Sequence, residues 1–284
     1  MLSLFYQFLD TFAFLVLAST GLAVIFGMMG VINLAHGEFI MVGAYATAFS
    51  AAAGVPLILA IGVGTLAAGI FGVILERLVI RHLYHRLLDS IVATFAISLI
   101  ITQGTLIILG PTAPAIGTPL GSVTFGGQSF SVYRIVLAGM AIGLLALMYW
   151  FFMYTRYGVY ARATIQNPSM AAALGVHTRR LYMVTFGFGA ALAGLTGGLY
   201  APTMSLEPLI GTDFIVQAFV TVVVGGGNIL IGLPPAAALL AVIQSSLTAW
   251  QGQLIGQVGL LVAVILVIRI LPQGISGLLR GRNV

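Results

Sequence analysis

Cysteine and lysine are both absent from this sequence of 284 residues, and charged residues make up only 6% of it. The absence of cysteine excludes disulfide bonds and thiol chemistry. A charged fraction far below the roughly 25% of soluble domains excludes an ordinary water-soluble fold. The net charge of +5 comes entirely from arginine, and most arginines lie in short connections between apolar runs. We therefore interpret them as charges that orient membrane segments, and we expect no nucleic-acid partner.

Motifs that would make the chain an enzyme are also missing. The sequence contains no H-E-x-x-H metalloprotease helix, no G-x-S-x-G elbow and no P-loop. We expect no catalytic residue, no metal site and no cofactor bound by this chain. Any ATP that drives it must be hydrolysed at partner subunits.

Apolar residues dominate the sequence. They make up 60% of the chain, and the mean hydropathy is +1.14. Stretches near membrane-spanning length follow one another without the alternation of a β-barrel. The sequence predicts an all-α polytopic membrane protein, a single transmembrane domain over residues 1–284 with about eight or nine transmembrane helices. The apolar segments are 8–30, 38–53, 56–76, 90–109, 133–153, 181–201, 213–231, 235–250 and 254–271.

Arginines gather in three connections, which predicts the orientation of the chain. They lie within 77–86, within 154–180 and in the C-terminal tail, and the positive-inside rule places all three in the cytoplasm. The stretches 110–132 and 201–213, which contain no arginine, then lie outside, and so does the N-terminus if the first three segments all cross. We expect a multi-pass protein of a bacterial cytoplasmic (inner) membrane.

Two Gly-rich interruptions place polar residues between apolar segments, "GVINLAHGEF" near 30–38 and "VVVGGGNILIGLPP" near 225–235. Paired interruptions are typical of transporters built from internal repeats, and ionisable residues inside a membrane usually face a polar cavity. The alternative is a helix break that satisfies its own polar groups, with a carboxylate in the first turn of a helix that begins near Gly37. The candidate translocation-path residues are Asn33, His36, Glu38, Gly226 and Asn228.

The segment 154–180 contains a complete signal for a short helix. Asn167 is a good N-cap, Pro168 suits the first helical position, and Gly175 suits the C-terminal stop. Met170 and Leu174 lie four residues apart and form one small apolar face. Two interpretations remain open: a helix that docks into a groove of a soluble partner, and an interfacial helix on the lipid headgroups.

Five stretches together resemble the permease subunits of ABC importers for branched-chain amino acids, and the similar permeases of urea importers. They are "GLAVIFGMMGVINLAHGEFIMVGAY" (21–45), "ERLVIRHLY" (76–84), "RATIQNPSMAAALGV" (162–176), "TFGFGAALAGLTGG" (185–198) and "VVVGGGN" (222–228). The resemblance implies a pore formed with a second homologous permease subunit (or another copy of this chain), two cytoplasmic ATPase subunits and an extracytoplasmic substrate-binding protein. It also implies ATPase coupling by Arg162, Gln166, Asn167, Pro168, Met170, Ala171, Leu174 and Gly175.

The resemblance leaves the substrate open between branched-chain amino acids and urea or short amides. Met170, the stretch 211–219 and "PQG" at 272–274 look closer to the urea branch. The chain departs from the family pattern at Pro234 and Pro235, where a Gly-rich run is expected, and these prolines leave the start of the next helix open. The competing class is a stand-alone secondary transporter or channel for a small neutral solute, which has no evident use for a capped cytoplasmic helix.

Two further features carry open alternatives. Ala190, Gly194 and Gly198 form a stripe of small residues, which serves either packing within the chain or an interface with the second permease. Glu207 and Asp213 lie in an expected outer loop, where they either contact the substrate-binding protein or remain plain solvated charges.

Overall fold

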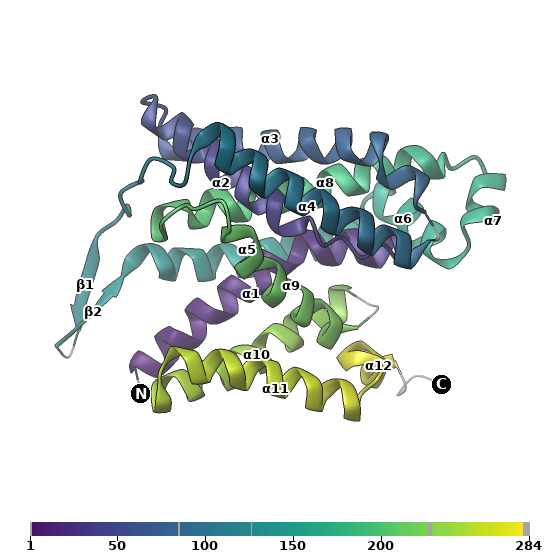
Figure 1. The fold of residues 1–284 in the computed structure, drawn as a ribbon. Helices are drawn as coiled ribbons and strands as arrows, with labels where there is room; N and C mark the ends of the chain where they lie inside the picture. Colours follow the sequence, from purple (N-terminus) through teal and green to yellow (C-terminus); the bar gives the residue numbers. More distant parts are fainter. Residues whose placement is uncertain (1, 85, 126, 227–228, 281–284) are drawn as a thin grey trace. The chain divides into compact units, whose positions relative to one another are not determined.

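The computed structural model describes residues 2–84, 86–125, 127–226 and 229–280. Regular structure within these ranges is helical apart from one β-hairpin, which confirms the predicted all-α membrane class (Figure 1). The α-helices are α1 (Leu2–Met29), α2 (His36–Ala52), α3 (Leu57–Leu78), α4 (Leu87–Leu109), α5 (Val132–Tyr154), α6 (Arg156–Gln166), α7 (Pro168–Ala173), α8 (Thr178–Tyr200), α9 (Ile210–Gly225), α10 (Ile229–Gln251), α11 (Gln253–Ile270) and α12 (Gly274–Arg280). Short 3₁₀ turns cover Ile80–His82 and Ala201–Thr203, and the antiparallel hairpin pairs β1 (Ser122–Phe125) with β2 (Gln128–Ser131).

Seven helices of the described chain are long and apolar enough to cross a bilayer by themselves. They correspond to α1, α3, α4, α5, α8, α10 and α11. Helices α2 and α9 are shorter, with 17 and 16 residues. The count of eight or nine spans therefore stays a prediction that depends on these two helices.

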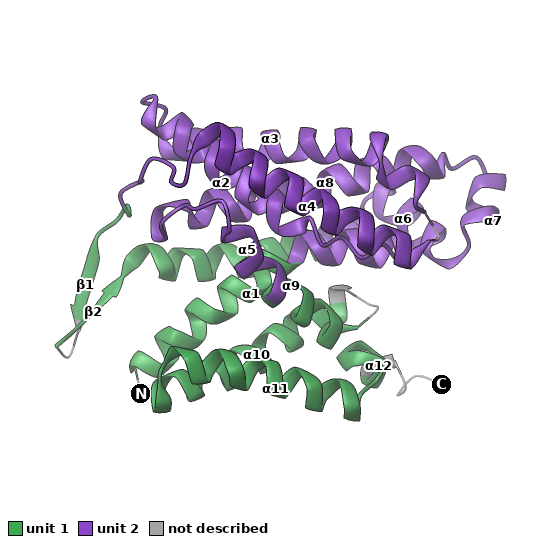
Figure 2. Cartoon of the chain, viewed as in Figure 1, with its two compact units in different colours: residues 1–19, 118–149, 217–284 green, residues 20–117, 150–216 purple. Residues whose placement is uncertain are grey.

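Contacts between Cα atoms divide the chain into two compact units (Figure 2). Unit 1 comprises residues 1–19, 118–149 and 217–284, and unit 2 comprises 20–117 and 150–216. Each unit combines segments that are far apart in the sequence. The prediction of one domain over 1–284 is not tested by this division.

Helices α2, α3 and α8 form the core of unit 2, and glycine allows their backbones to touch. A Cβ added to Gly43 would lie 2.3 Å from the backbone of Gly194, and one added to Gly64 would lie 2.4 Å from the carbonyl oxygen of Gly43. Gly194 and Gly198 both pack against α3, next to Ala68 and Ile61. The stripe of small residues on α8 is thus used for packing within the chain.

The N-terminal ends of α1 and α5 lie side by side in unit 1. Arg134 of α5 forms an ion pair with Asp10 of α1 at 2.5 Å. The Tyr6 hydroxyl accepts from the Ser131 backbone N–H at 3.1 Å, and its ring lies edge-on to Phe130 at 5.0 Å. These contacts fix both helix ends at the same membrane face.

Two predicted helix boundaries are wrong. Helix α9 begins at Ile210, three residues before the predicted apolar segment 213–231. Helix α10 begins at Ile229 and includes Pro234 and Pro235, so the second interruption does not extend to 235. Pro234 and Pro235 are the sixth and seventh residues of this helix, beyond the first four whose N–H groups have no helical partner, so α10 lacks two internal hydrogen bonds there while both prolines keep a helical φ.

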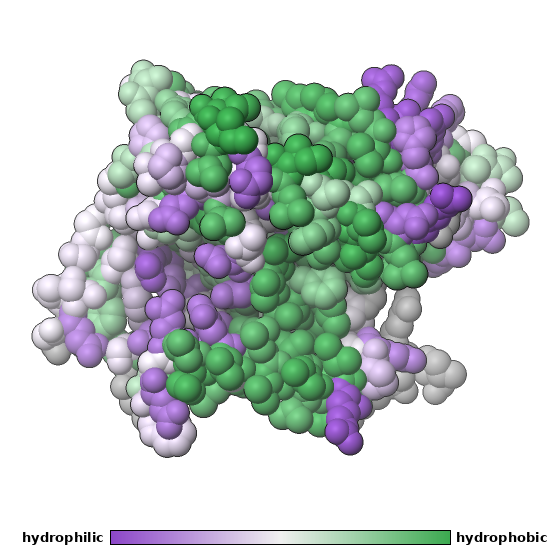
Figure 3. Space-filling model, viewed as in Figure 1, coloured by the Kyte–Doolittle hydropathy of each residue, from purple (hydrophilic) through white to green (hydrophobic). Residues whose placement is uncertain are grey.

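The surface of unit 2 suits a lipid environment. Helix α4 exposes many large apolar side chains, among them Ile107 at 82% and Leu88 at 74%. The face in Figure 3 is largely apolar over α3 and α4, and hydrophilic residues gather at the end of the unit that carries α6 and α7. This separation agrees with an apolar belt that ends at a basic, water-exposed face.

Candidate functional site

The first interruption is a short non-helical segment between α1 and α2. Gly30 ends α1 with a positive φ of 63°, and its N–H donates to the carbonyl of Phe26 at 2.8 Å. Asn33 is fully buried, and its side-chain oxygen accepts from the N–H of Ala35 at 3.0 Å. The amide nitrogen of Asn33 has no hydrogen-bond partner among the described residues. Within the break, the side-chain oxygen of Asn33 is thus hydrogen-bonded, whereas its side-chain NH₂ group is a buried donor without an acceptor among the described residues.

Glu38 stands in the first turn of α2, as predicted, and only 1% of it is exposed. One carboxylate oxygen accepts a hydrogen bond from Ser98 of α4 at 2.8 Å. The other oxygen has no hydrogen-bond partner among the described residues, although Thr102 lies close to the carboxyl group. A carboxylate at this position also gains from the positive end of the helix dipole.

A stripe of hydroxyl groups on α4 faces this break, and sequence reasoning missed it. Thr94 accepts from the backbone N–H of Leu34 at 3.1 Å, and Ser98 binds Glu38. The stripe consists of Ser90, Thr94, Ser98 and Thr102, spaced by four residues on a largely apolar helix. That spacing places them on one helix face, and it is a signal that the sequence already contained.

His36 and the start of α2 lie near the middle of a membrane span. Helix α8 belongs to the full-length candidate span Thr178–Thr203, and Gly189 stands at the centre of α8. A Cβ added to Gly21 would lie 2.3 Å from the carbonyl oxygen of Gly189 and 3.0 Å from the His36 ring. The structure thus brings Asn33, His36 and Glu38 together, buried, at mid-depth beside α8.

The second interruption has different surroundings. Gly226 has a positive φ of 81°, and a Cβ there would lie 2.4 Å from the carbonyl oxygen of Gln273 and 2.6 Å from the Ser276 hydroxyl. The start of α12 therefore packs on this break within unit 1. Asn228, the other predicted path residue of this half, lies outside the described residues.

The predicted cytoplasmic helix exists as α7, and its caps are the predicted ones. The Asn167 side chain accepts from the N–H of Met170 at 3.0 Å, and Pro168 is the first helical residue. Gly175 follows the helix with a φ of 92°. Met170 and Leu174 are 58% and 79% exposed, so the apolar face points away from the protein.

The remaining predicted coupling residues divide into exposed and anchoring ones. Gln166 is the exposed last residue of α6, a helix that sequence reasoning did not anticipate. Ala171 is buried and faces inward. The Arg162 guanidinium donates to the carbonyl oxygen of Phe152, at the C-terminal end of α5. Cations are favourable at that end of a helix, and Arg162 thereby ties α6 to α5.

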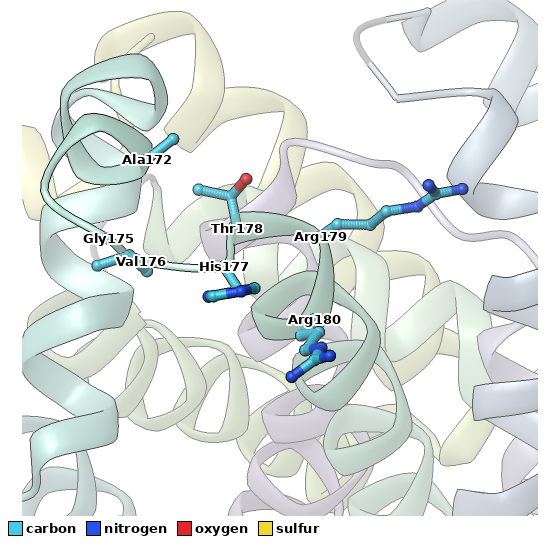
Figure 4. Close-up of a pocket in the computed structure, with 7 residues that line it drawn as sticks. All are labelled: Ala172, Gly175, Val176, His177, Thr178, Arg179 and Arg180. Carbon is cyan, nitrogen blue, oxygen red and sulfur yellow. The ribbon is translucent and has the colours of Figure 1, made fainter.

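A surface hollow of about 390 Å³ lies between α7 and the start of α8 (Figure 4). The lining residues are Ala172, Gly175, Val176, His177, Thr178, Arg179 and Arg180. The two arginine side chains point in different directions in Figure 4, away from the α7 side of the hollow. The hollow therefore combines small residues from the end of α7 with two basic residues from the start of α8.

Comparison with known proteins identifies the family of this chain. A protein-family model described as "Branched-chain amino acid transport system / permease component" matches residues 4–271. The chain is 26% identical over 283 residues to the high-affinity branched-chain amino acid transport system permease protein LivH of Salmonella typhimurium, covering 92% of this chain and 90% of the relative.

Two other relatives give similar values. The chain is 27% identical to the probable branched-chain amino acid transport permease protein LivH of Methanocaldococcus jannaschii, covering 93% of this chain and 88% of the relative. It is 27% identical to the permease protein BraD of Pseudomonas aeruginosa, covering 92% and 91%. No solved structure matches the chain. The match over nearly the whole sequence shows that the chain belongs to the permease-component family of branched-chain amino acid transport systems.

Proposed function

We propose that this chain forms, with a second homologous permease subunit or another copy of itself, the translocation path of an ABC importer for branched-chain amino acids. The observation that carries the proposal is the family match over residues 4–271. The relatives are named as branched-chain amino acid permeases, and this favours an amino acid over urea or another short amide.

The chain needs partners to do this work. Two cytoplasmic ATPase subunits supply the energy from ATP, and an extracytoplasmic substrate-binding protein delivers the solute. Helix α7 supports the ATPase assignment, because a capped six-residue helix with an exposed apolar face is too short to be stable alone. Its Met170 and Leu174 side chains suit a groove on a soluble partner. The proposed location of the transporter is the bacterial cytoplasmic (inner) membrane.

Transport then proceeds by alternating access. ATP binding draws the ATPases together and moves α7, and this motion is passed to the spans through α6 and α8, which both contact α7. The path opens along the polar break of unit 2, where Asn33, His36, Glu38 and the α4 hydroxyls lie together. Gly226 and Asn228 stay proposed path residues at the second break.

The test is uptake of labelled leucine and labelled urea by proteoliposomes that contain the chain with its partner permease, ATPases and binding protein. We expect leucine uptake that requires both ATP and the binding protein. ATP-dependent uptake of urea alone would contradict the amino-acid assignment. Uptake of either solute without ATP would contradict the importer assignment and favour a stand-alone transporter.

A further inference from the structure

We propose that Asp213 lines the translocation path near mid-depth in the bilayer and pairs there with the ammonium group of the transported amino acid. The inference rests on the proposed transport function and adds to it one residue that contacts the substrate. A solute with a cationic group fits this site, and urea, which has none, does not.

The depth of Asp213 follows from backbone contacts. The first turn of α2 lies beside the middle of the α8 span, as shown above. Gly37 of that turn packs directly on the first turn of α9, because a Cβ on Gly37 would lie 2.0 Å from the carbonyl oxygen of Gly211. Asp213 is two residues further along α9, or about 3 Å of helix rise. The carboxylate therefore belongs to the membrane interior and not to the outer loop that the sequence predicted.

The orientation of α9 turns Asp213 away from the packed core. Gly211 and Phe214 are buried, and the Phe214 ring meets Tyr200 at 6.0 Å. Asp213 and Val216 are exposed, Val216 at 49%. None of the ion pairs formed by the described residues includes Asp213.

An ionised side chain at this depth cannot face lipid at low cost, so it faces water or an ionic partner. The exposed Val216 lies one helical turn from Asp213 and provides an apolar surface beside the acid. An acid next to an aliphatic surface complements a molecule that carries an ammonium group close to an aliphatic side chain. Branched-chain amino acids have this arrangement.

The first test replaces Asp213 in the complete transporter in proteoliposomes. We expect Asp213→Asn to lower maximal leucine uptake at least ten-fold at saturating binding protein, while ATP hydrolysis stays within about two-fold of the unmodified complex. Asp213→Glu should recover part of the uptake. Asp89→Asn is the control, because Asp89 is an exposed acid paired with Arg86 at the N-terminal end of α4. Unchanged uptake in Asp213→Asn would overturn the proposal. A change in only the half-saturating concentration of binding protein would also overturn it, because that result indicates that Asp213 contacts the binding protein.

A second measurement does not depend on transport activity. The chain has no native cysteine, so an Asp213→Cys variant carries one thiol, and its modification can be followed on this chain by mass spectrometry. A water-filled path allows the thiol at this position to react with charged, membrane-impermeant thiol reagents during ATP turnover. Lack of modification during ATP turnover would place the residue against lipid or protein and overturn the proposal.

The two proposals fail in different ways. Absence of ATP-dependent leucine uptake by the unmodified complex contradicts the proposed function itself. Normal uptake by the unmodified complex, combined with full activity of Asp213→Asn, contradicts only the role of Asp213.

Discussion

At the scale of single residues, Glu38 acts as a junction between three helices. A buried carboxylate in a membrane needs compensation, and Glu38 obtains it from the Ser98 hydroxyl of α4 and from the first turn of its own helix α2. The first turn of α9 also approaches it, since a Cβ on Gly211 would lie 2.9 Å from the second carboxylate oxygen. These contacts connect α4, which exposes most of its surface, to the core of unit 2.

Removal of the Ser98 hydroxyl should therefore destabilise the protein. Ser98→Ala leaves the Glu38 carboxylate without its hydrogen-bond donor, and we expect a loss of about 1–3 kcal/mol. The measurement is the thermal unfolding temperature of the purified complex. Thr65→Ala is the control, because among the described residues the Thr65 hydroxyl donates only to the carbonyl of Ile61 in its own helix. Equal shifts in the two variants would contradict the role of Ser98.

A second buried carboxylate, Glu76, closes the end of α3. It accepts a hydrogen bond from the Tyr84 hydroxyl and lies 3.6 Å from the Arg81 guanidinium. Burial raises the pKa of Tyr84 well above its usual value of 10.0, and the hydrogen bond to Glu76 is the second-largest cause of this increase. The phenol therefore stays protonated and acts as a donor throughout the physiological range.

Tyr84→Phe should lower the unfolding free energy by about 1–3 kcal/mol, because it leaves buried Glu76 without this donor. The raised pKa means that the folded state holds the phenolic proton more tightly, so the contribution is complete below the unfolded pKa and falls above it. We expect a constant difference between the unmodified and variant proteins below about pH 10 and a shrinking one above it. Denaturant titrations of the two proteins at pH values below and above 10 measure this difference in unfolding free energy. A difference that grows above pH 10 would contradict the assignment.

The sequence identified the polar residues of the first break but not their partners. Asn33, His36 and Glu38 stand out because they interrupt apolar runs, and the structure places all three in one buried site. The Ser98 contact depends on how α4 packs on α2, which local patterns do not encode. Asp213 was assigned to an outer loop because the stretch 201–213 contains no arginine, whereas packing of Gly211 against Gly37 allows α9 to begin earlier.

At the scale of elements, α7 exposes two apolar side chains, Met170 and Leu174, at the end of unit 2 where arginines gather. We expect Leu174→Asp to abolish ATP-driven uptake, because it places a charge on a side chain that is 79% exposed and that the proposed function buries in an ATPase groove. Membrane insertion should be unchanged, since no span is altered. Uptake and co-purification of the ATPases with the permease are the measurements.

Ser169→Asp provides the matched control for that variant. It adds the same charge to the same helix, in the first turn, where the helix dipole favours an acid. We expect uptake close to that of the unmodified transporter. Normal uptake in Leu174→Asp, or equal losses in both variants, would contradict coupling through this face of α7.

Local signals decided which elements the sequence could predict. The caps of α7 lie within a few residues of the helix, so Asn167, Pro168 and Gly175 were sufficient to place it. The start of α10 depends on tertiary packing: a Cβ on Gly232 would lie 1.9 Å from the carbonyl oxygen of Gly225, so the helix closes tightly on the end of α9. Two prolines near its start therefore misled the prediction.

At the scale of the whole molecule, contacts between α1 and α5 determine how the intervening chain crosses the membrane. The Asp10–Arg134 ion pair and the Tyr6–Ser131 hydrogen bond hold the N-terminal ends of these helices together. A chain that leaves one face and returns to it crosses an even number of times. Helices α1, α3 and α4 are three candidate crossings, and we expect the fourth to come from the non-helical segment 30–35 together with α2. The N-terminal end of α1 then lies on the same side as the β-hairpin.

This topology predicts that the N-terminal end of α1 faces the extracytoplasmic side, because the arginine-rich connections at 77–86 and 154–180 are expected to face the cytoplasm. A reporter that is active only outside the cytoplasm should be active when fused ahead of α1 and inactive when inserted at Gly175, between α7 and α8. A reporter that is active only in the cytoplasm should show the opposite pattern. Fusion at Gly127, in the turn of the hairpin, is the positive control for the outer face. Activity of the cytoplasmic reporter at the N-terminus would mean that α2 does not complete a crossing, and the mid-depth position of Glu38 and Asp213 would then need another explanation.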